Sequence, residues 1–315
     1  MDIVTNFLVN SPWIQLFYAR LPLFIGVLLY LAFAGVGGML LAGRVLAKKR
    51  KRSSYDKCAQ QIGFIALLLG LPLVIGTKIY LYMETGSLYP TQLQDYFLEA
   101  AWFMSALTVF YIFLYINIWK LVNKKTWLQN IFGTICTLQG FIGTITILVI
   151  YKILESQNTD FTYQSTVNFI LTLIPKPLSA EFTADICLIP IFFLLPAVFG
   201  NLGLLCLRHI NDYGRDHYNI AIAWCTNWIK TFGSLLFLIV LTISGINIWL
   251  QFESETFDYF IWLDTGIFLF IWFIIVLIMT LIGRSQIPLR HKFSMVFADI
   301  LAIASIYFCL DWLLP

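Results

Sequence analysis

The sequence predicts an all-α integral membrane protein with eight transmembrane helices, arranged as two four-helix bundles with both termini outside. Composition predicts this class, because 60% of the 315 residues are hydrophobic, 28 of them phenylalanine, and only 12% are charged. A soluble domain of this length leaves about a quarter of its chain surface exposed, which does not suit so apolar a composition. Lipid must be the main solvent, so the bilayer is the first expected partner.

Eight apolar segments are long enough to cross a bilayer, which takes about 20 mostly apolar residues per helix. The apolar runs are continuous rather than alternating, and this favours helices over the strands of a membrane barrel. The predicted spans are 18–46, 58–82, 97–121, 129–153, 183–208, 219–250, 259–283 and 293–314.

Charge in the connecting loops predicts the orientation of these spans. Basic loops follow the first, third, fifth and seventh spans, beginning with "AKKRKRSSYDK", whereas the other exits, such as "ESQNTDFTYQ", are acidic or neutral. Because basic loops stay on the cytoplasmic side, both termini are expected to face outward. The net charge of +3 is accounted for by these loops and gives no reason to expect a nucleic-acid partner.

Loop signs and loop lengths also predict the division of the chain. The first four-helix bundle is expected over residues 1–153 and the second over 183–315, with an amphipathic connection at the outer interface over 154–182. The segments "GTKIYLYMETG" (76–86) and "GINIWLQFESE" (245–255) hold corresponding places in the two halves. This suggests a parallel 4+4 repeat, although chance similarity between apolar helices is the competing explanation.

Ionisable residues inside the spans are the first candidates for function, because each costs roughly 3 kcal/mol in the membrane. Lys78 and Glu99 lie at similar depth near the outer ends of neighbouring spans, so they are expected to be able to pair. Lys230 and Asp299 lie deeper on the cytoplasmic side and are candidates for a buried ion pair. The alternative is that the lysines extend to the headgroups and the carboxylates lie in interfacial water.

No metal site is expected. His209, His217 and His291 fall in cytoplasmic loops or at their edges, where solvated side chains are the simplest interpretation. The six cysteines lie in or beside apolar segments without a C-x-x-C spacing, as small buried apolar residues do. No catalytic or nucleotide-binding motif occurs, and the "GVGG" at 35–38 predicts close helix packing.

With this topology, the chain resembles subunit I of the cytochrome bd quinol oxidases over roughly residues 18–250. The resemblance is carried by Arg20-Leu21 at the start of the first helix, "SSYDK" (53–57) in a basic loop and a glycine-spaced second helix. It continues with "FLEAAWF" around Glu99 at the start of the third helix, and with "IPKPLSAEF" before the fifth.

The departures from that family concern its haem ligands. Tyr30 stands at or near the place of the first-helix histidine, and Ala184 or Asp185 stands at that of the fifth-helix histidine. Asp185 is expected to cap the fifth helix, where a negative charge is favourable. The long quinol-site loop is short here, and a ninth helix is missing.

The resemblance therefore implies a membrane subunit of a respiratory electron-transfer complex, with other respiratory membrane or periplasmic subunits as partners, in the bacterial cytoplasmic (inner) membrane. It implies no haem in this chain and leaves quinone as a small-molecule partner. The quinone or proton-path candidates are Lys78, Tyr80, Tyr82, Glu84 and Glu99.

Three other interpretations stay open. The chain could be a quinone-binding membrane anchor of the polysulfide- or nitrite-reductase type. Buried charges and parallel repeats also suit an eight-helix transporter or channel. A structural or assembly protein without a small ligand is the third.

Overall fold

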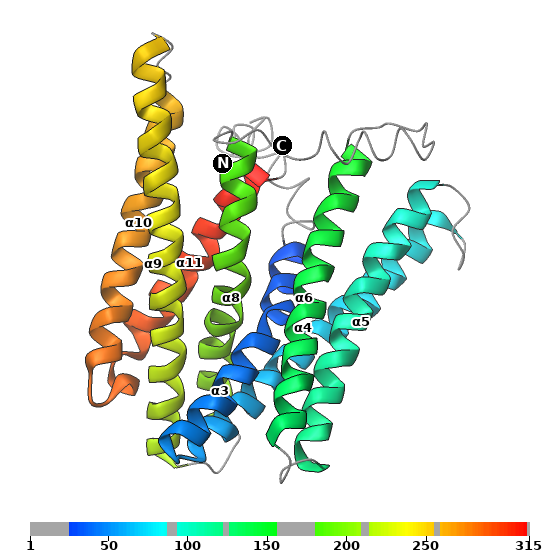
Figure 1. Ribbon diagram of the computed structural model, residues 1–315, viewed down its shortest axis with the longest axis vertical. Coiled ribbons are helices and arrows are strands. Elements are labelled where there is room, and N and C mark those ends of the chain that lie inside the picture. The colour runs from blue at the N-terminus through cyan, green and yellow to red at the C-terminus, as the bar shows by residue number, and fades with distance from the viewer. Residues whose placement is uncertain are drawn as a thin grey trace, which may run out of the picture.

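Long helices make up the computed structural model of the chain, which describes residues 25–86, 93–121, 126–155, 180–208, 214–254 and 259–313 (Figure 1). The first span runs from Ile25 to Arg50 and turns at Gly35, so that its second part is α3. The elements are α3 (Val36–Arg50), α4 (Ser54–Thr85), α5 (Leu93–Leu121), α6 (Thr126–Glu155), α8 (Ala180–Leu207), α9 (Arg215–Ser254), α10 (Tyr259–Arg284), the 3-10 turn η1 (Pro288–His291) and α11 (Lys292–Leu313).

Seven of these helices are long and apolar enough to cross a membrane, and they coincide with the first seven predicted spans to within a few residues at most described ends. The all-α class is thereby confirmed for the described residues, with seven helices that could span a membrane. The eighth predicted span is occupied by α11, a helix of 22 residues that is not among those seven. The amphipathic segment expected within 154–182 falls almost wholly outside the described residues.

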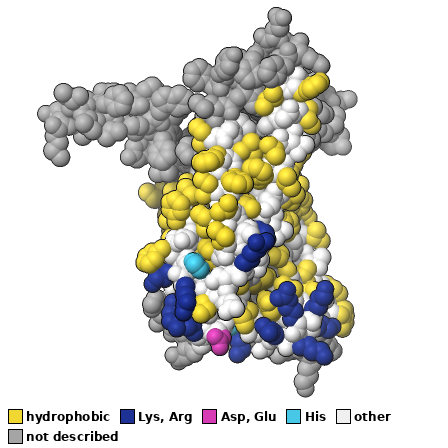
Figure 2. All heavy atoms as spheres, turned by 90° about the vertical axis from the view of Figure 1, so that its left-hand side faces the viewer, with side chains coloured by type: hydrophobic (Ala, Val, Ile, Leu, Met, Phe, Trp, Pro, Cys, Tyr) yellow, Lys and Arg dark blue, Asp and Glu magenta, His cyan; other side chains and the backbone are white. Residues whose placement is uncertain are grey.

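Large apolar side chains cover the outer faces of the helices. Phe270, Leu281 and Phe273 of α10 are all more than half exposed, and Figure 2 shows a broad apolar band with lysines and arginines gathered toward one end of the molecule. Contiguous exposed apolar surface of this extent is unfavourable in water and matches a lipid environment.

The first basic loop is shorter than the sequence predicts. The first span does not end at residue 46 but continues to Arg50, so that Lys48, Lys49 and Arg50 form the last helical turn. Basic side chains are favourable there because the carboxyl end of a helix carries partial negative charge. Lys51, at φ 53°, ends the helix: its N–H donates to the Lys48 carbonyl, and the N–H of Arg52 donates to the Ala47 carbonyl.

Helix contacts fall into two sets of four. In the first set, α3 packs on α4, α4 on α5, α5 on α6, and α6 back on α3. In the second, α8 packs on α9, α9 on α10, α10 on α11, and α11 back on α8. The sets meet where α8 contacts α3 and α4 and where α4 contacts α9, as the ribbon in Figure 1 illustrates.

Glycines bring the backbones of these helices into direct contact. A Cβ atom on Gly140 of α6 would lie 2.1 Å from the carbonyl oxygen of Ala34, and one on Gly35 would lie 1.8 Å from that of Phe192. Gly35 packs against the carbonyl group of Phe192. This carbonyl receives no hydrogen bond from residue 196, because Pro196 has no N–H to donate. The close packing predicted for residues 35–38 is therefore confirmed.

Candidate functional site

The ion pair expected from depth alone is present between α4 and α5. Lys78 of α4 and Glu99 of α5 form a salt bridge whose side chains are 28% and 24% exposed. The ring of Trp102, one turn beyond Glu99, lies 4.8 Å from the Lys78 ammonium, and its indole N–H donates to the Val74 carbonyl at 2.9 Å. The three side chains thus form one cluster with its indole tied to α4, which we call the outer cluster (Lys78, Glu99, Trp102).

The outer cluster lies within an apolar surface. Ile75 and Ile79 flank Lys78 on α4 and are more than half exposed. A half-buried ion pair in such a setting interacts more strongly than one in water, and either partner can form hydrogen bonds to a ligand that arrives through lipid. Chemically, the carboxylate can accept a proton and the ammonium can donate to a carbonyl oxygen.

The other residues of the predicted quinone site do not join the outer cluster. Tyr80 is 62% exposed and Tyr82 is 49% exposed. No hydrogen bond of either phenol is recorded with the cluster. Glu84 lies in the last turn of α4, and its side chain is outside the described part. Exposed tyrosines near a helix end are typical of the aromatic belt at a membrane interface.

Tyr30 is the residue that the sequence resemblance sets at or near the family's first-helix histidine, a correspondence that stays a prediction. Its side chain is buried, and its hydroxyl donates to the Gly140 carbonyl at 3.5 Å. A Cβ atom on Gly143 would lie 2.3 Å from that hydroxyl, and the Phe33 ring lies edge-on to Tyr30 with centroids 5.2 Å apart. Packing this close leaves no room for a porphyrin beside Tyr30, so the residues here do not fit a haem.

The second matched position lies on α8. Helix α8 begins at Ala180, so Ala184 and Asp185 are in its second turn and Asp185 is not the capping residue that the sequence suggested. An extra turn of helix before the first strongly apolar residues explains the difference. The side chains of both residues are outside the described part.

The structure does not join Lys230 to Asp299. Asp299 on α11 is 0% exposed, whereas Lys230 on α9 is only half-buried. Among the described residues, neither carboxylate oxygen of Asp299 has a hydrogen-bond partner. The predicted depth is similar for both residues, but depth does not fix the direction in which each helix turns its side chains.

Asp299 instead lies among neutral polar side chains, which the sequence analysis did not single out. The amide of Asn201 on α8 is beside the carboxyl group, and the Cys225 thiol on α9 is close enough to interact with it electrostatically. The Cys58 thiol on α4 lies against that of Cys225. All four side chains have zero exposure, and we call them the buried cluster (Asp299, Asn201, Cys225, Cys58). A signal existed in the sequence, because Asn201 interrupts a long apolar run.

His217 is buried rather than solvated. Helix α9 begins at Arg215, which moves His217 from the expected loop into the first helical turn, where it is 9% exposed. Its Nε2 lies 3.0 Å from Gln61 Oε1 on α4. Gln61 is three residues beyond Cys58 on the same helix, so the two lie on one face. Cys58 of the buried cluster therefore shares a face of α4 with the Gln61 that contacts His217.

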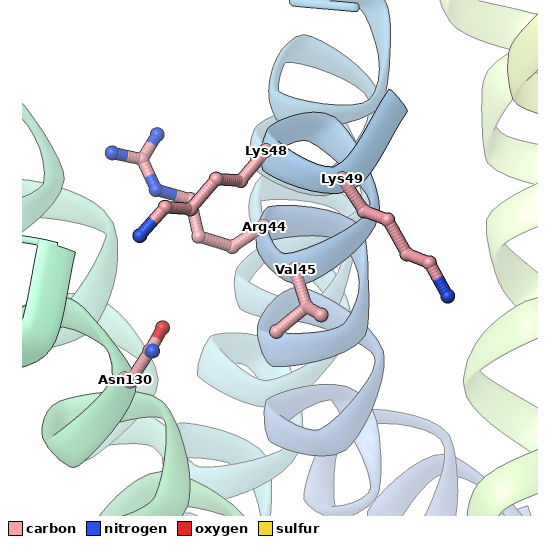
Figure 3. A pocket seen from close by; sticks show the side chains of 5 residues that line it. All are labelled: Arg44, Val45, Lys48, Lys49 and Asn130. Carbon is pink, nitrogen blue, oxygen red and sulfur yellow. The ribbon is translucent and has the colours of Figure 1, made fainter. Parts of the chain in front are cut away.

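A third polar site lies at the basic end of α3. A cavity of about 260 Å³ is lined by Arg44, Lys48, Lys49 and Asn130. Figure 3 shows Arg44 and Lys48 on the side facing Asn130 of α6, whereas Lys49 points the other way. Basic pockets of this kind can hold anionic headgroups, but Arg44 is already paired with Asp56.

Among the described residues, no group of three His, Cys, Asp or Glu side chains that could hold a metal ion occurs. Of the described cysteines, Cys58, Cys136, Cys187 and Cys225 are buried, as predicted, whereas Cys206 is exposed.

Comparisons with protein-family models, with curated proteins and with solved structures find no match for the chain. The resemblance to subunit I of the cytochrome bd quinol oxidases stays a prediction from the sequence.

Proposed function

We propose that the chain is a multi-pass membrane subunit of a respiratory electron-transfer complex, similar in plan to subunit I of the cytochrome bd quinol oxidases but without a haem of its own. Two observations support the plan. The described helices pack as two sets of four in chain order, and Tyr30, the residue proposed to replace the family's haem-ligating histidine, is buried with its hydroxyl bonded to the Gly140 carbonyl.

The proposal includes the finer topology. Helix α11 is the eighth span, the sets α3–α6 and α8–α11 are parallel repeats, and both chain termini lie on the outer side of a bacterial cytoplasmic membrane. The support is electrostatic, because cations gather toward one end of the molecule (Figure 2) and such ends face the cytoplasm. Arg50, Arg208 and Arg284, each at or just beyond the carboxyl end of a helix, belong to that end.

Quinone is the proposed small-molecule partner, and the outer cluster is its site. The observation that carries this assignment is the Lys78–Glu99 ion pair, held half-buried in a lipid-facing surface and braced by Trp102. A quinol must give up its protons as it is oxidised, and Glu99 can accept one. Lys78 pairs with the Glu99 carboxylate until then and can donate to a quinone carbonyl.

The electrons need an acceptor outside this cluster, so the proposal requires partner subunits that carry redox centres. A cytochrome c partner would indicate a complex of the oxidase type. An iron–sulfur partner would indicate a membrane anchor of the polysulfide- or nitrite-reductase type. Purification of the native complex from membranes in mild detergent, followed by identification of its subunits, separates these arrangements.

Equilibrium binding of a short-chain ubiquinone analogue to the purified protein tests the quinone site. Glu99→Gln keeps the shape but removes the charge, and loss of one charge-assisted hydrogen bond, about 1.5–3 kcal/mol, weakens binding by roughly tenfold or more. Asp56→Asn is the matched control, because it also removes a carboxylate from an ion pair, at the other end of α4. Equal affinity of wild type and Glu99→Gln contradicts the site.

One observation favours a second function, that of a transporter or channel. Asp299 is completely buried without a hydrogen-bond partner in the described part of the chain, and an ionisable residue inside a helix bundle is typical of ion and proton pathways. Ion or proton flux into proteoliposomes that contain the purified chain alone, abolished by Asp299→Asn, would establish that function in place of the respiratory one.

A further inference from the structure

Asp299 points into the protein, two turns from the start of α11. Its helix neighbours Met295, Ala298 and Ala302 are all buried, which defines the inward face of α11. The carboxyl group is therefore removed from both lipid and water.

The groups that face Asp299 come from other helices and are neutral polar side chains. They are Asn201 of α8 and Cys225 of α9, with Cys58 of α4 behind Cys225. Helix α4 belongs to the first helix set and the other three helices belong to the second. The buried cluster therefore lies where the two sets meet.

The nearby cations do not neutralise Asp299. Lys230 of α9 and Arg208 just beyond α8 are half-buried and form no recorded ion pair with it, while Arg284, Arg290 and His291 of α10 and η1 are exposed at the basic end. The ion pairs Arg44–Asp56 and Lys78–Glu99 of the described ranges both lie on residues other than Asp299.

An ionised carboxylate in this setting would be strongly unfavourable, because burial removes its hydration and no opposite charge replaces it. A metal cation is poorly provided for as well. Hard cations take about six oxygen ligands, whereas the buried cluster offers the carboxyl oxygens of Asp299 and the single amide oxygen of Asn201. A proton needs only one oxygen and removes the charge completely.

We propose that Asp299 is a proton-binding site at the junction of the two helix sets, held as a neutral carboxylic acid beside Asn201 and connected to the basic end of the protein through Gln61 and His217. Binding adds a proton to one carboxylate oxygen of Asp299, and release returns this proton to the basic end of the protein by the same route. The end of this route nearest the start of α9 is His217, which is 9% exposed and whose Nε2 lies 3.0 Å from Gln61 Oε1.

This site is independent of the proposed quinone site, because it uses no residue of the outer cluster. If the protein binds quinone but Asp299 is not found protonated, only the present inference is overturned. If Asp299 is protonated but the protein binds no quinone, only the proposed function is overturned.

Dicyclohexylcarbodiimide tests the inference, since it adds to protonated carboxyl groups in apolar surroundings. Purified full-length protein is treated with dicyclohexylcarbodiimide at neutral and at alkaline pH, and the peptide that carries the adduct is identified by mass spectrometry. We expect an adduct on Asp299 that decreases at alkaline pH and is lost in Asp299→Asn. Asp56, ion-paired with Arg44, is the internal control and should stay unlabelled.

Infrared difference spectroscopy covers the case in which the reagent cannot reach the site. Wild type should show the carbonyl stretch of a protonated carboxylic acid that is absent from Asp299→Asn, and His217→Ala should slow the exchange of this proton for deuterium. Presence of that band supports the proposal whether or not the label appears. Absence of both the adduct and the band at neutral pH overturns it.

Discussion

Replacement of Gly140 by alanine tests the packing of the first helix set. A Cβ atom at this position would lie 2.1 Å from the Ala34 carbonyl oxygen, about 1.3 Å short of ordinary van der Waals contact. The atom in the way belongs to a helix backbone, so no side-chain rotation can relieve the clash. Helix α6 must move away from the first span, and this movement also disturbs the contact of Tyr30 with Gly140.

The expected cost follows from two opposing effects. Overpacking a well-filled interface costs typically 1–3 kcal/mol, whereas alanine is favoured over glycine within a helix by up to about 1 kcal/mol. Gly140→Ala is therefore expected to lose about 1–2 kcal/mol of stability, which lowers the thermal unfolding midpoint by a few degrees.

Gly245→Ala on α9 is the matched control, because a Cβ atom there would meet nothing within 4 Å. This variant gains the helix preference without a clash and should be as stable as wild type or slightly more stable. Thermal unfolding of both purified variants in the same detergent makes the comparison. A Gly140→Ala protein as stable as Gly245→Ala would refute the direct backbone contact between the first span and α6.

Three further changes test other parts of the structure. Trp272→Ala, which empties a completely buried position of the second helix set, should cost about 3–5 kcal/mol in the same unfolding assay, and a loss below about 1 kcal/mol would contradict its place in the core. Trp102→Phe removes the indole hydrogen bond to Val74 and should cost about 1 kcal/mol, whereas unchanged stability would mean that the indole is not tied to α4. Arg52→Cys and Met83→Cys, at opposite ends of α4 and both exposed, should react with a membrane-impermeant thiol reagent from the cytoplasmic and the outer side respectively, and labelling of both from one side would contradict the topology.

The helices were predictable because lipid imposes a simple requirement on sequence. Each span must present about 20 apolar residues, and runs of that kind are visible without knowing what they pack against. The Lys78–Glu99 pair was predictable for a related reason, since both residues stand near the outer ends of consecutive helices. Helix ends were less accurate where basic residues such as Lys48 and Lys49 continue the helix.

The direction of each side chain around its helix could not be predicted from depth. Lys230 and Asp299 were expected to pair at similar depth, yet the structure turns Asp299 toward Asn201 and leaves the two apart. The polar neighbours of His217 in the sequence predict a loop at this position. The helix begins at Arg215, and the first turn brings the imidazole against Gln61.

Photo-crosslinking with an azido-substituted ubiquinone tests the quinone assignment most directly. The purified protein, or its native complex, is irradiated with the probe, and the modified peptide is located by mass spectrometry. The account predicts modification of α4 or α5 near Lys78 and Glu99, with competition by unlabelled ubiquinone and a marked decrease in Glu99→Gln. Specific, competed modification confined to other helices, or none at all in the intact complex, would contradict it.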